Sequence, residues 1–104
     1  MLKERIRNEQ VHFITYLQKL IKNNRIDDGE ALEISIKFMH DGLESLSKQQ
    51  WAVFLEKAIL SDNFVDNCER CSEIMPWSNM YRALFIHQDH LCENCRYYEN
   101  KVNV

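Results

Sequence analysis

The chain has 104 residues, of which 45% are hydrophobic and 28% are charged, a balance typical of one folded domain with a modest core and not of a disordered segment. It contains only two glycines and one proline, which favours helices over a many-stranded β fold. The net charge of −3 is uneven: residues 1–25 carry six basic and two acidic side chains, whereas residues 26–104 carry seven basic and fourteen acidic ones, a balance that disfavours generic binding to phosphate backbones.

Residues 3–23 are predicted to form an amphipathic helix. Its apolar side chains fall within one arc at about 100° per residue, as in a helix that packs on a core. The arc consists of Ile6, Phe13, Ile14, Leu17, Leu20 and Ile21. Basic residues spread around the opposite side, where they indicate a solvated face or, alternatively, a contact with nucleic acid or an acidic partner. They are Arg5, Arg7, Lys19 and Lys22.

Residues 28–41 fit two patterns. Positions 32–38 alternate like a half-buried strand, but the same apolar residues also cover one side of a helical wheel. Asp27 or Asp28 is a suitable helix N-cap, and Gly42 is a suitable helix end. We favour a helix because the neighbouring segments are helical and no strand partner is evident.

Residues 48–60 carry the clearest helix signal. Ser47 and Gln50 have the spacing of a capping box, with Leu46 and Trp51 placed as the hydrophobic staple around it. The main apolar stripe of this helix is Trp51, Phe54, Leu55 and Ala58. Val53 and Leu60 lie on another side, and we expect this second stripe to pack on the C-terminal part, so that the whole chain shares one core.

All four cysteines lie in two Cys-x-x-Cys pairs, separated by twenty residues: Cys68, Cys71, Cys92 and Cys95. Two such turns present four sulfurs to one tetrahedral ion, a ligand set typical of a closed structural zinc site without a position for water or substrate. We therefore predict one structural Zn²⁺. Two disulfides, an iron–sulfur centre and a thioredoxin-like redox pair are alternatives that the spacing and surroundings favour less.

Catalysis and a membrane location find little support in the sequence. It contains no Gly-rich phosphate loop, nucleophile elbow or carboxylate dyad, and His87 and His90 lack the second ligand set of a metal nuclease. We predict no catalytic residue and no small-molecule substrate. No apolar run resembles a signal peptide or a membrane span, so a cytoplasmic location is expected.

Pro76 is predicted to start a short helix between the two cysteine pairs. One face of that helix, with Trp77, Met80, Tyr81 and Leu84, is interpreted as a small core beside the metal or, alternatively, as an exposed aromatic platform. Under the second interpretation aromatic and basic side chains form the partner surface. Its residues are Trp77, Tyr97, Tyr98, Arg5, Lys19 and Lys22.

Residues 68–76 (CERCSEIMP) and 91–99 (LCENCRYYE) resemble the zinc finger of the DksA/TraR family. The resemblance covers about a third of the chain and implies a helical hairpin that enters the RNA polymerase secondary channel and alters initiation. The family finger has a slightly shorter insert and a glycine where Ser72 stands. The acidic tip of that hairpin matches Asp27, Asp28 and Glu30 in place only, and Gly42 makes the second helix short for a long probe.

A second resemblance covers more of the chain. Residues 41–50 (DGLESLSKQQ), residues 76–78 (PWS) and the two cysteine pairs are similar to small uncharacterised bacterial and phage-type proteins. Such proteins join a helical N-terminal part to a four-cysteine ribbon. The resemblance implies this architecture but no activity.

Together these features predict a mainly α fold. A three-helix part, residues 1–61, packs on a four-cysteine zinc module, residues 62–104, of treble-clef or ribbon type with an optional short β-hairpin. The expected function is that of a non-catalytic accessory or regulatory protein that recognises a macromolecule, with a protein favoured as partner. The alternative is a nucleic-acid-binding or RNA polymerase-binding regulator of DksA/TraR type.

Overall fold

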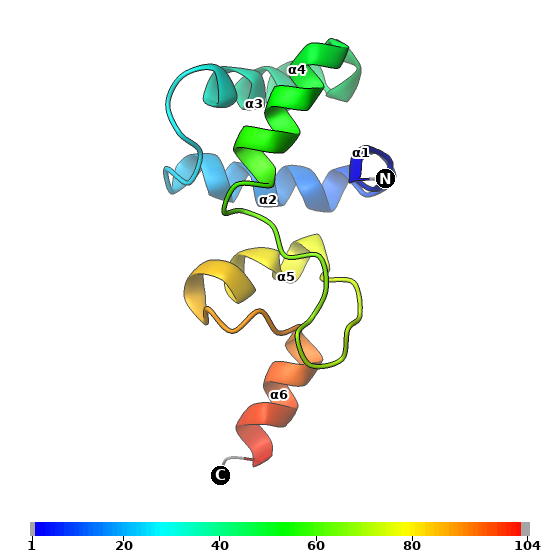
Figure 1. Cartoon of the computed structure of the whole chain (residues 1–104), viewed down its shortest axis with the longest axis vertical. Coiled ribbons are helices and arrows are strands. Elements are labelled where there is room, and N and C mark those ends of the chain that lie inside the picture. The colour runs from blue at the N-terminus through cyan, green and yellow to red at the C-terminus, as the bar shows by residue number, and fades with distance from the viewer. Residues whose placement is uncertain (1, 103–104) are drawn as a thin grey trace. The chain divides into compact units, whose positions relative to one another are not determined.

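The computed structural model describes residues 2–102, and most of this length is helical (Figure 1). In chain order the elements are α1 (Leu2–Asn8), α2 (Gln10–Lys22), α3 (Glu30–Asp41), the 3₁₀ turn η1 (Leu43–Ser45), α4 (Lys48–Val53), the π-helical η2 (Phe54–Ile59), α5 (Trp77–Tyr81), the π-helical η3 (Arg82–Ile86) and α6 (Glu93–Val102). Within the described range the only β pairing is an isolated antiparallel bridge between Asn67 and Ile74. The prediction of a mainly α fold is confirmed. None of the described helices combines the length and apolarity needed to cross a bilayer.

The chain divides into two compact units, Met1–Asn63 and Phe64–Val104. Asn63 belongs to the first unit because its side-chain amide donates to two backbone carbonyls there, while its own carbonyl accepts from a buried tyrosine hydroxyl. These partners are Arg25 (3.0 Å), Ala58 (2.7 Å) and Tyr16 (2.6 Å). The first unit therefore ends at Asn63, two residues beyond residue 61, the predicted end of the helical part.

The first predicted helix, residues 3–23, is divided at Glu9 into α1 and α2, and the chain changes direction there (Figure 1). Glu9 has a φ of −122° and a ψ of 37°, outside helical values. Its N–H still donates to the carbonyl of Arg5, and its carbonyl accepts from the N–H of Phe13, each at 3.0 Å. Since no glycine or proline marks this point, the apolar pattern alone predicts one helix. The first unit therefore contains α1, α2, α3 and the joined α4–η2 helix, and not three helices.

Residues 30–41 form α3, so the helix interpretation of this ambiguous segment is confirmed. The residue before the helix is Gly29, with a φ of 113°, and not either of the two aspartates proposed as N-cap, Asp27 and Asp28. Gly42 ends the helix as predicted, with a φ of 86° and its N–H donating to the carbonyl of Phe38 at 2.9 Å. Positive φ at both ends explains why glycine stands there.

Aromatic rings from three successive helices form the core of the first unit. Phe38 of α3 stacks on Phe54 with ring centroids 5.3 Å apart. Phe13 of α2 and Trp51 of α4 meet the Phe38 ring edge-on, at 5.6 Å and 5.9 Å. All four side chains are buried, and each such ring pair stabilises a core by about 0.5–1.5 kcal/mol beyond its buried area.

The predicted capping box at the start of α4 is confirmed. The Ser47 hydroxyl accepts from the Gln50 N–H at 3.1 Å, and the Gln50 side-chain oxygen accepts from the Ser47 N–H at 2.9 Å. Leu46 and Trp51 are both buried, as a hydrophobic staple requires.

Beyond Val53 the same helix continues in π form through η2. It closes with the Leu60 N–H donating to the carbonyl of Leu55, five residues back, at 2.8 Å. The predicted packing of Val53 and Leu60 on the C-terminal part is a contact between the two units, which are described separately. The shared core therefore stays a prediction.

The second unit has a small core built on α5. Pro76 precedes this helix in extended backbone, and Trp77 and Met80 are buried. The Trp77 ring lies 5.7 Å from the ring of Phe64. Of the two interpretations of this helix face, the structure therefore supports the packed core.

Candidate metal centre

The sulfur atoms of the four predicted ligands converge. Those of Cys68, Cys71, Cys92 and Cys95 all lie within 4.8 Å of one another, and the pair from Cys71 and Cys92 is 3.8 Å apart. A tetrahedral zinc ion with Zn–S bonds of about 2.3 Å places its sulfurs about 3.8 Å apart. None of the four thiols forms a disulfide. The cluster therefore has the ligand number, ligand type and size that one zinc ion requires.

The first pair lies in a tight turn closed by the Asn67–Ile74 bridge. Within it, the Cys68 N–H donates to the carbonyl of Glu73 at 2.8 Å, and the Ser72 N–H donates to the carbonyl of Cys68 at 2.9 Å. Ser72 has a φ of 64°, a left-handed conformation that favours glycine.

The second pair lies at the start of α6. Cys92 precedes the helix, and its carbonyl accepts from the N–H of Arg96 at 3.0 Å. Cys95 lies in the first helical turn. The N–H groups and the positive end of the helix dipole at this terminus favour negatively charged sulfur.

The pKa values of the thiols differ because their surroundings differ. Burial disfavours the Cys68 thiolate, but hydrogen bonds from the backbone of Cys71, Cys92 and Arg70 lower the pKa of Cys68 to about 6. Burial, together with the neighbouring sulfurs, raises the pKa of Cys95 to about 12. A divalent cation that binds the cluster must therefore displace the proton of Cys95, whereas Cys68 ionises more readily.

The cluster has a buried side and an exposed side. Cys68 and Cys95 are buried, Cys92 is half-buried and Cys71 is exposed. An ion held by all four sulfurs has no vacant position for water or substrate, and four thiolates give a Zn²⁺ site a net charge of about −2. This arrangement suits a structural role and not hydrolytic chemistry.

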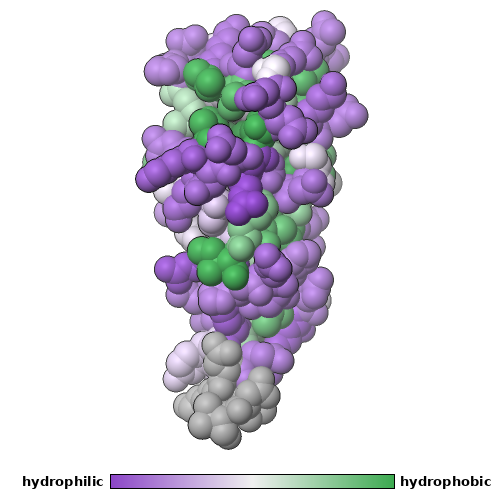
Figure 2. Space-filling model, turned by 90° about the vertical axis from the view of Figure 1, so that its left-hand side faces the viewer, coloured by the Kyte–Doolittle hydropathy of each residue, from purple (hydrophilic) through white to green (hydrophobic). Residues whose placement is uncertain are grey.

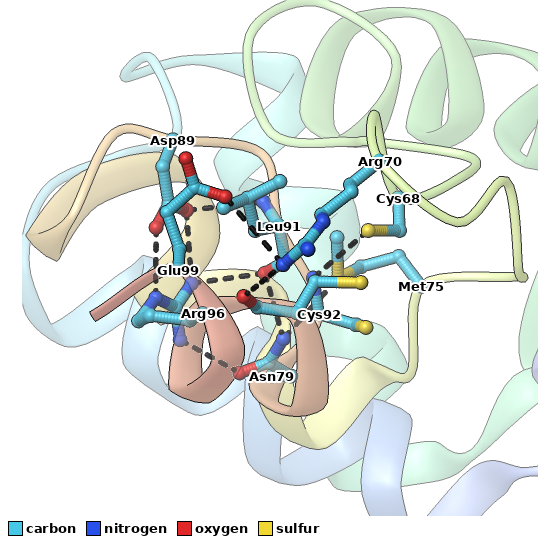
Figure 3. A network of polar contacts seen from close by, with 10 residues as sticks. Cys68, Arg70, Met75, Asn79, Asp89, Leu91, Cys92, Arg96 and Glu99 are labelled. Atoms are coloured by element: carbon cyan, nitrogen blue, oxygen red, sulfur yellow. Dashed lines mark hydrogen bonds and ion pairs between the residues drawn. The ribbon is translucent and has the colours of Figure 1, made fainter. Parts of the chain in front are cut away.

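A polar network adjoins the second pair (Figure 3). The Arg96 guanidinium donates to both carboxylate oxygens of Asp89, at 2.8 Å and 2.9 Å, and this lowers the pKa of Asp89 to about 2. Arg70 donates to the carbonyl of Cys95 at 3.2 Å and pairs with Glu99 at 3.6 Å. These charged side chains line an open hollow of about 510 Å³ together with Glu69 and Leu91.

Sequence reasoning missed Asp89, Arg96 and their buried partner Asn79. Arg96 follows a cysteine directly, and a charged residue there reads as part of an exposed helix surface. The signal that was available is its position in the first turn of a helix that must pack beside the metal site.

The six residues proposed as a partner surface have different surroundings. Trp77 is 1% exposed and belongs to the core, whereas Tyr97 and Tyr98 are 61% and 57% exposed on α6. In the first unit Lys19 and Lys22 are exposed. The Arg5 side chain is 14% exposed and pairs with Glu9 at 3.5 Å.

His90 does not belong to the cluster of candidate ligand atoms, and its Nδ1 lies 3.3 Å from a carboxylate oxygen of Glu69. Comparison of the chain with protein-family models, curated proteins and solved structures found no match in any of the three. The resemblances to the DksA/TraR finger and to phage-type proteins therefore depend on the quoted residues alone.

Proposed function

We propose that this protein is a non-catalytic zinc-binding accessory or regulatory protein that recognises another protein. The convergence of four cysteine sulfurs within 4.8 Å carries the proposal. A complete set of four protein ligands supports a structural ion, because no coordination position is left for a reaction. The ion then shapes the second unit, and the surface of the folded chain does the recognition.

Metal content is the first test. Protein purified without added metal is expected to hold one zinc per chain by elemental mass spectrometry. Cobalt-substituted protein is expected to show the sulfur-to-metal charge-transfer bands of a tetrahedral four-thiolate site. Absorption typical of an iron–sulfur cluster, or no retained metal, would contradict the zinc assignment.

A groove between α2 and α3 supports a protein partner. Ile21, Ile36 and Met39 line a hollow of about 250 Å³, and Ile36 is 41% exposed. On the face drawn in Figure 2, the exposed hydrophobic residues form separate patches. Scattered patches of this kind are ordinary on a folded protein. The groove differs because its apolar residues adjoin one another between two helices, a geometry that suits an inserted amphipathic segment.

The rim of the groove specifies the chemistry of that segment. Lys22 and His40 line it with Gln18, and the residues that line this hollow include no carboxylate. A partner helix with apolar anchors flanked by Asp or Glu complements this surface in shape and in charge.

A displayed library of helical peptides tests this surface. Selection on the zinc-loaded protein is expected to enrich peptides with apolar residues at i and i+4 and acidic flanks. Their binding should weaken at least about tenfold on Ile36→Ser or Lys22→Glu. The control Ile74→Ser, at an exposed isoleucine of the second unit, should not change it. Enriched basic peptides, or equal binding to all variants, would contradict the proposal.

A transcription regulator of DksA/TraR type is the second candidate. A hollow of about 390 Å³ is lined by Asp27, Asp28 and Glu30 together with residues of η2. The position of these acidic residues after α2 corresponds to the acidic hairpin tip of that family. However, α2 and α3 have 13 and 12 residues, so each is only about 20 Å long.

Direct binding assays separate the two candidates. DNA or RNA binding that weakens steeply between about 50 mM and 200 mM salt supports the nucleic-acid reading. Binding to purified RNA polymerase that depends on Asp27 and Asp28 supports the DksA/TraR reading. Neither is expected if the groove between α2 and α3 is the functional surface.

A further inference from the structure

We infer that Arg96 is a positioning residue of the metal site, which acts by holding the peptide group between Leu91 and Cys92 (Figure 3). The N–H of that peptide group donates to a ligand sulfur, and Asp89 and Asn79 complete the arrangement. The inference rests on the zinc-binding part of the proposed function. It adds three side chains that are not ligands but set how well the ligands hold the ion.

The geometry of one peptide group carries the inference. The carbonyl of Leu91 and the N–H of Cys92 belong to the same planar trans unit, so they point in opposite directions. The carbonyl oxygen accepts from Arg96 Nη2 at 2.9 Å and from Asn79 Nδ2 at 3.1 Å. The N–H donates to the sulfur of Cys68 at 3.3 Å. Two donors that hold the oxygen therefore direct the N–H toward the sulfur.

Arg96 is itself fixed from several sides. Its side chain is buried, and its Nε and Nη2 donate to the two carboxylate oxygens of Asp89 at 2.8 Å and 2.9 Å. Its Nη1 donates to the side-chain oxygen of Asn79 at 3.4 Å. One of the Asp89 oxygens also accepts from the N–H of Leu91 at 3.0 Å. The network thus holds both backbone groups of Leu91, the residue directly before the ligand.

Stability alone gives a weak reason for this network. The Arg96–Asp89 pair is only partly buried, and the desolvation of its charges offsets much of their attraction. Moreover, the network supports a loop in which Gln88 and His90 have φ values of 53° and 56°, a conformation that costs non-glycine residues free energy. The carbonyl of His90 accepts from the N–H of Glu69 at 3.1 Å, so the same loop also reaches the first cysteine turn. A strained loop held by directional bonds is typical of a preorganised site.

Hydrogen bonds to ligating sulfur spread its charge and orient it. Removing such outer partners of a metal site typically costs about 10- to 100-fold in metal affinity. We therefore expect Arg96→Met to bind zinc about 10- to 100-fold more weakly than the wild type, with all four thiolates still bound.

The test compares Arg96→Met with Arg82→Met, which changes an exposed arginine in the same unit. Chelator competition measures zinc affinity, and NMR of the ¹¹³Cd-loaded protein measures the coupling between the metal and the Cys92 amide proton through the N–H···S bond. The wild type and Arg82→Met should share affinity and coupling, whereas Arg96→Met should lose the coupling and the stated affinity. Unchanged coupling and affinity within about twofold of the wild type would overturn the inference.

Further variants keep the test decisive. Arg96→Lys should recover only part of the affinity, because an ammonium cannot reproduce the bidentate bond to Asp89. If Arg96→Met does not fold with metal, Asn79→Ala decides, since it removes one of the two donors to the Leu91 carbonyl. A weakened Cys92 coupling in this variant supports the inference, and an unchanged one overturns it. A wild type without a four-thiolate cobalt spectrum would instead end the zinc assignment itself.

Discussion

The interactions that stabilise the interior of each unit differ between the two units. The first, Met1–Asn63, has a core of stacked and edge-on aromatic rings, and a capping box starts its helix α4. The second, Phe64–Val104, has a smaller apolar core around Trp77, and its remaining segments meet at four sulfurs and a polar network. From this difference we expect that burial of apolar surface folds the first unit, whereas the second unit needs an ion at its sulfur cluster to fold.

Metal loss is expected to have the largest effect and to separate the units. Cys68→Ser, or complete chelation, should unfold the second unit, because the ion contributes apparent binding free energies on the order of 10–16 kcal/mol in small thiolate sites. Amide signals of residues 64–102 should collapse in NMR spectra, while core amides of α2 and α3 stay protected from exchange.

The first unit supplies the internal control for that experiment. If its core amides lose protection along with the second unit, the chain folds as one unit and the predicted shared core through Val53 and Leu60 gains support. Retained dispersion of the residue 64–102 signals after chelation would contradict the dependence on metal.

A change in the aromatic core should have the converse effect. Phe38→Ala removes a buried ring that contacts three others, and it should lower the free energy of unfolding of the first unit by about 3–5 kcal/mol. Urea denaturation followed by helical circular dichroism measures this loss. Zinc affinity should stay within about twofold of the wild type, since the ring lies in the other unit. A parallel fall in zinc affinity would contradict the division of roles.

The pH dependence of zinc affinity should sharpen the picture of the sulfur cluster. Zinc binds the thiolate, and the raised pKa values of Cys71 and Cys95 keep both protonated at pH 7, so binding releases at least two protons. The association constant for zinc should therefore fall at least about 100-fold when the pH is lowered from 8 to 7, which corresponds to about 2.7 kcal/mol of binding free energy.

The same titration should steepen in acid. Cys68, with a pKa of about 6, is ionised at pH 7 and releases no proton there, but below about pH 6 it adds one more proton to the exchange. Chelator competition in buffers of constant ionic strength measures the slope. If the logarithm of the association constant changed by less than two per pH unit between pH 7 and pH 8, Cys71 and Cys95 would not both be protonated in the metal-free protein.

What the sequence predicts depends on how far apart the interacting residues lie. The capping box joins Ser47 to Gln50, three residues on, and each cysteine pair spans four residues, so local spacing suffices to find them. The network of Asn79 and Arg96 joins residues seventeen apart, and no short motif marks it. The bend at Glu9 likewise has no local breaker, so only tertiary packing reveals it.

The candidate site divides in the same way. The candidate ligand set could be predicted from residue type, because free cysteines at this spacing are typical of metal sites. The exposure of a side chain does not follow from residue type. The amphipathic segment around Trp77 fits an exposed aromatic platform as well as a core, and the burial of Trp77 in the structure supports the core. The segment at 28–41 was ambiguous for a related reason, since its apolar residues satisfy both periods until a helix packs them.

The smallest expected effect concerns the cap of α4. Ser47→Ala removes the hydroxyl that accepts from the Gln50 N–H, and it should lower the free energy of unfolding of the first unit by about 1 kcal/mol. The matched control is Ser61→Ala, whose hydroxyl is exposed and donates to the carbonyl of Lys57, and which should change stability by less than about 0.5 kcal/mol. Urea denaturation of the zinc-loaded proteins measures both. Since the cap lies in the unit that folds by apolar burial, zinc affinity should be the same in both variants, and a cap effect on zinc affinity would mean that the two units depend on each other.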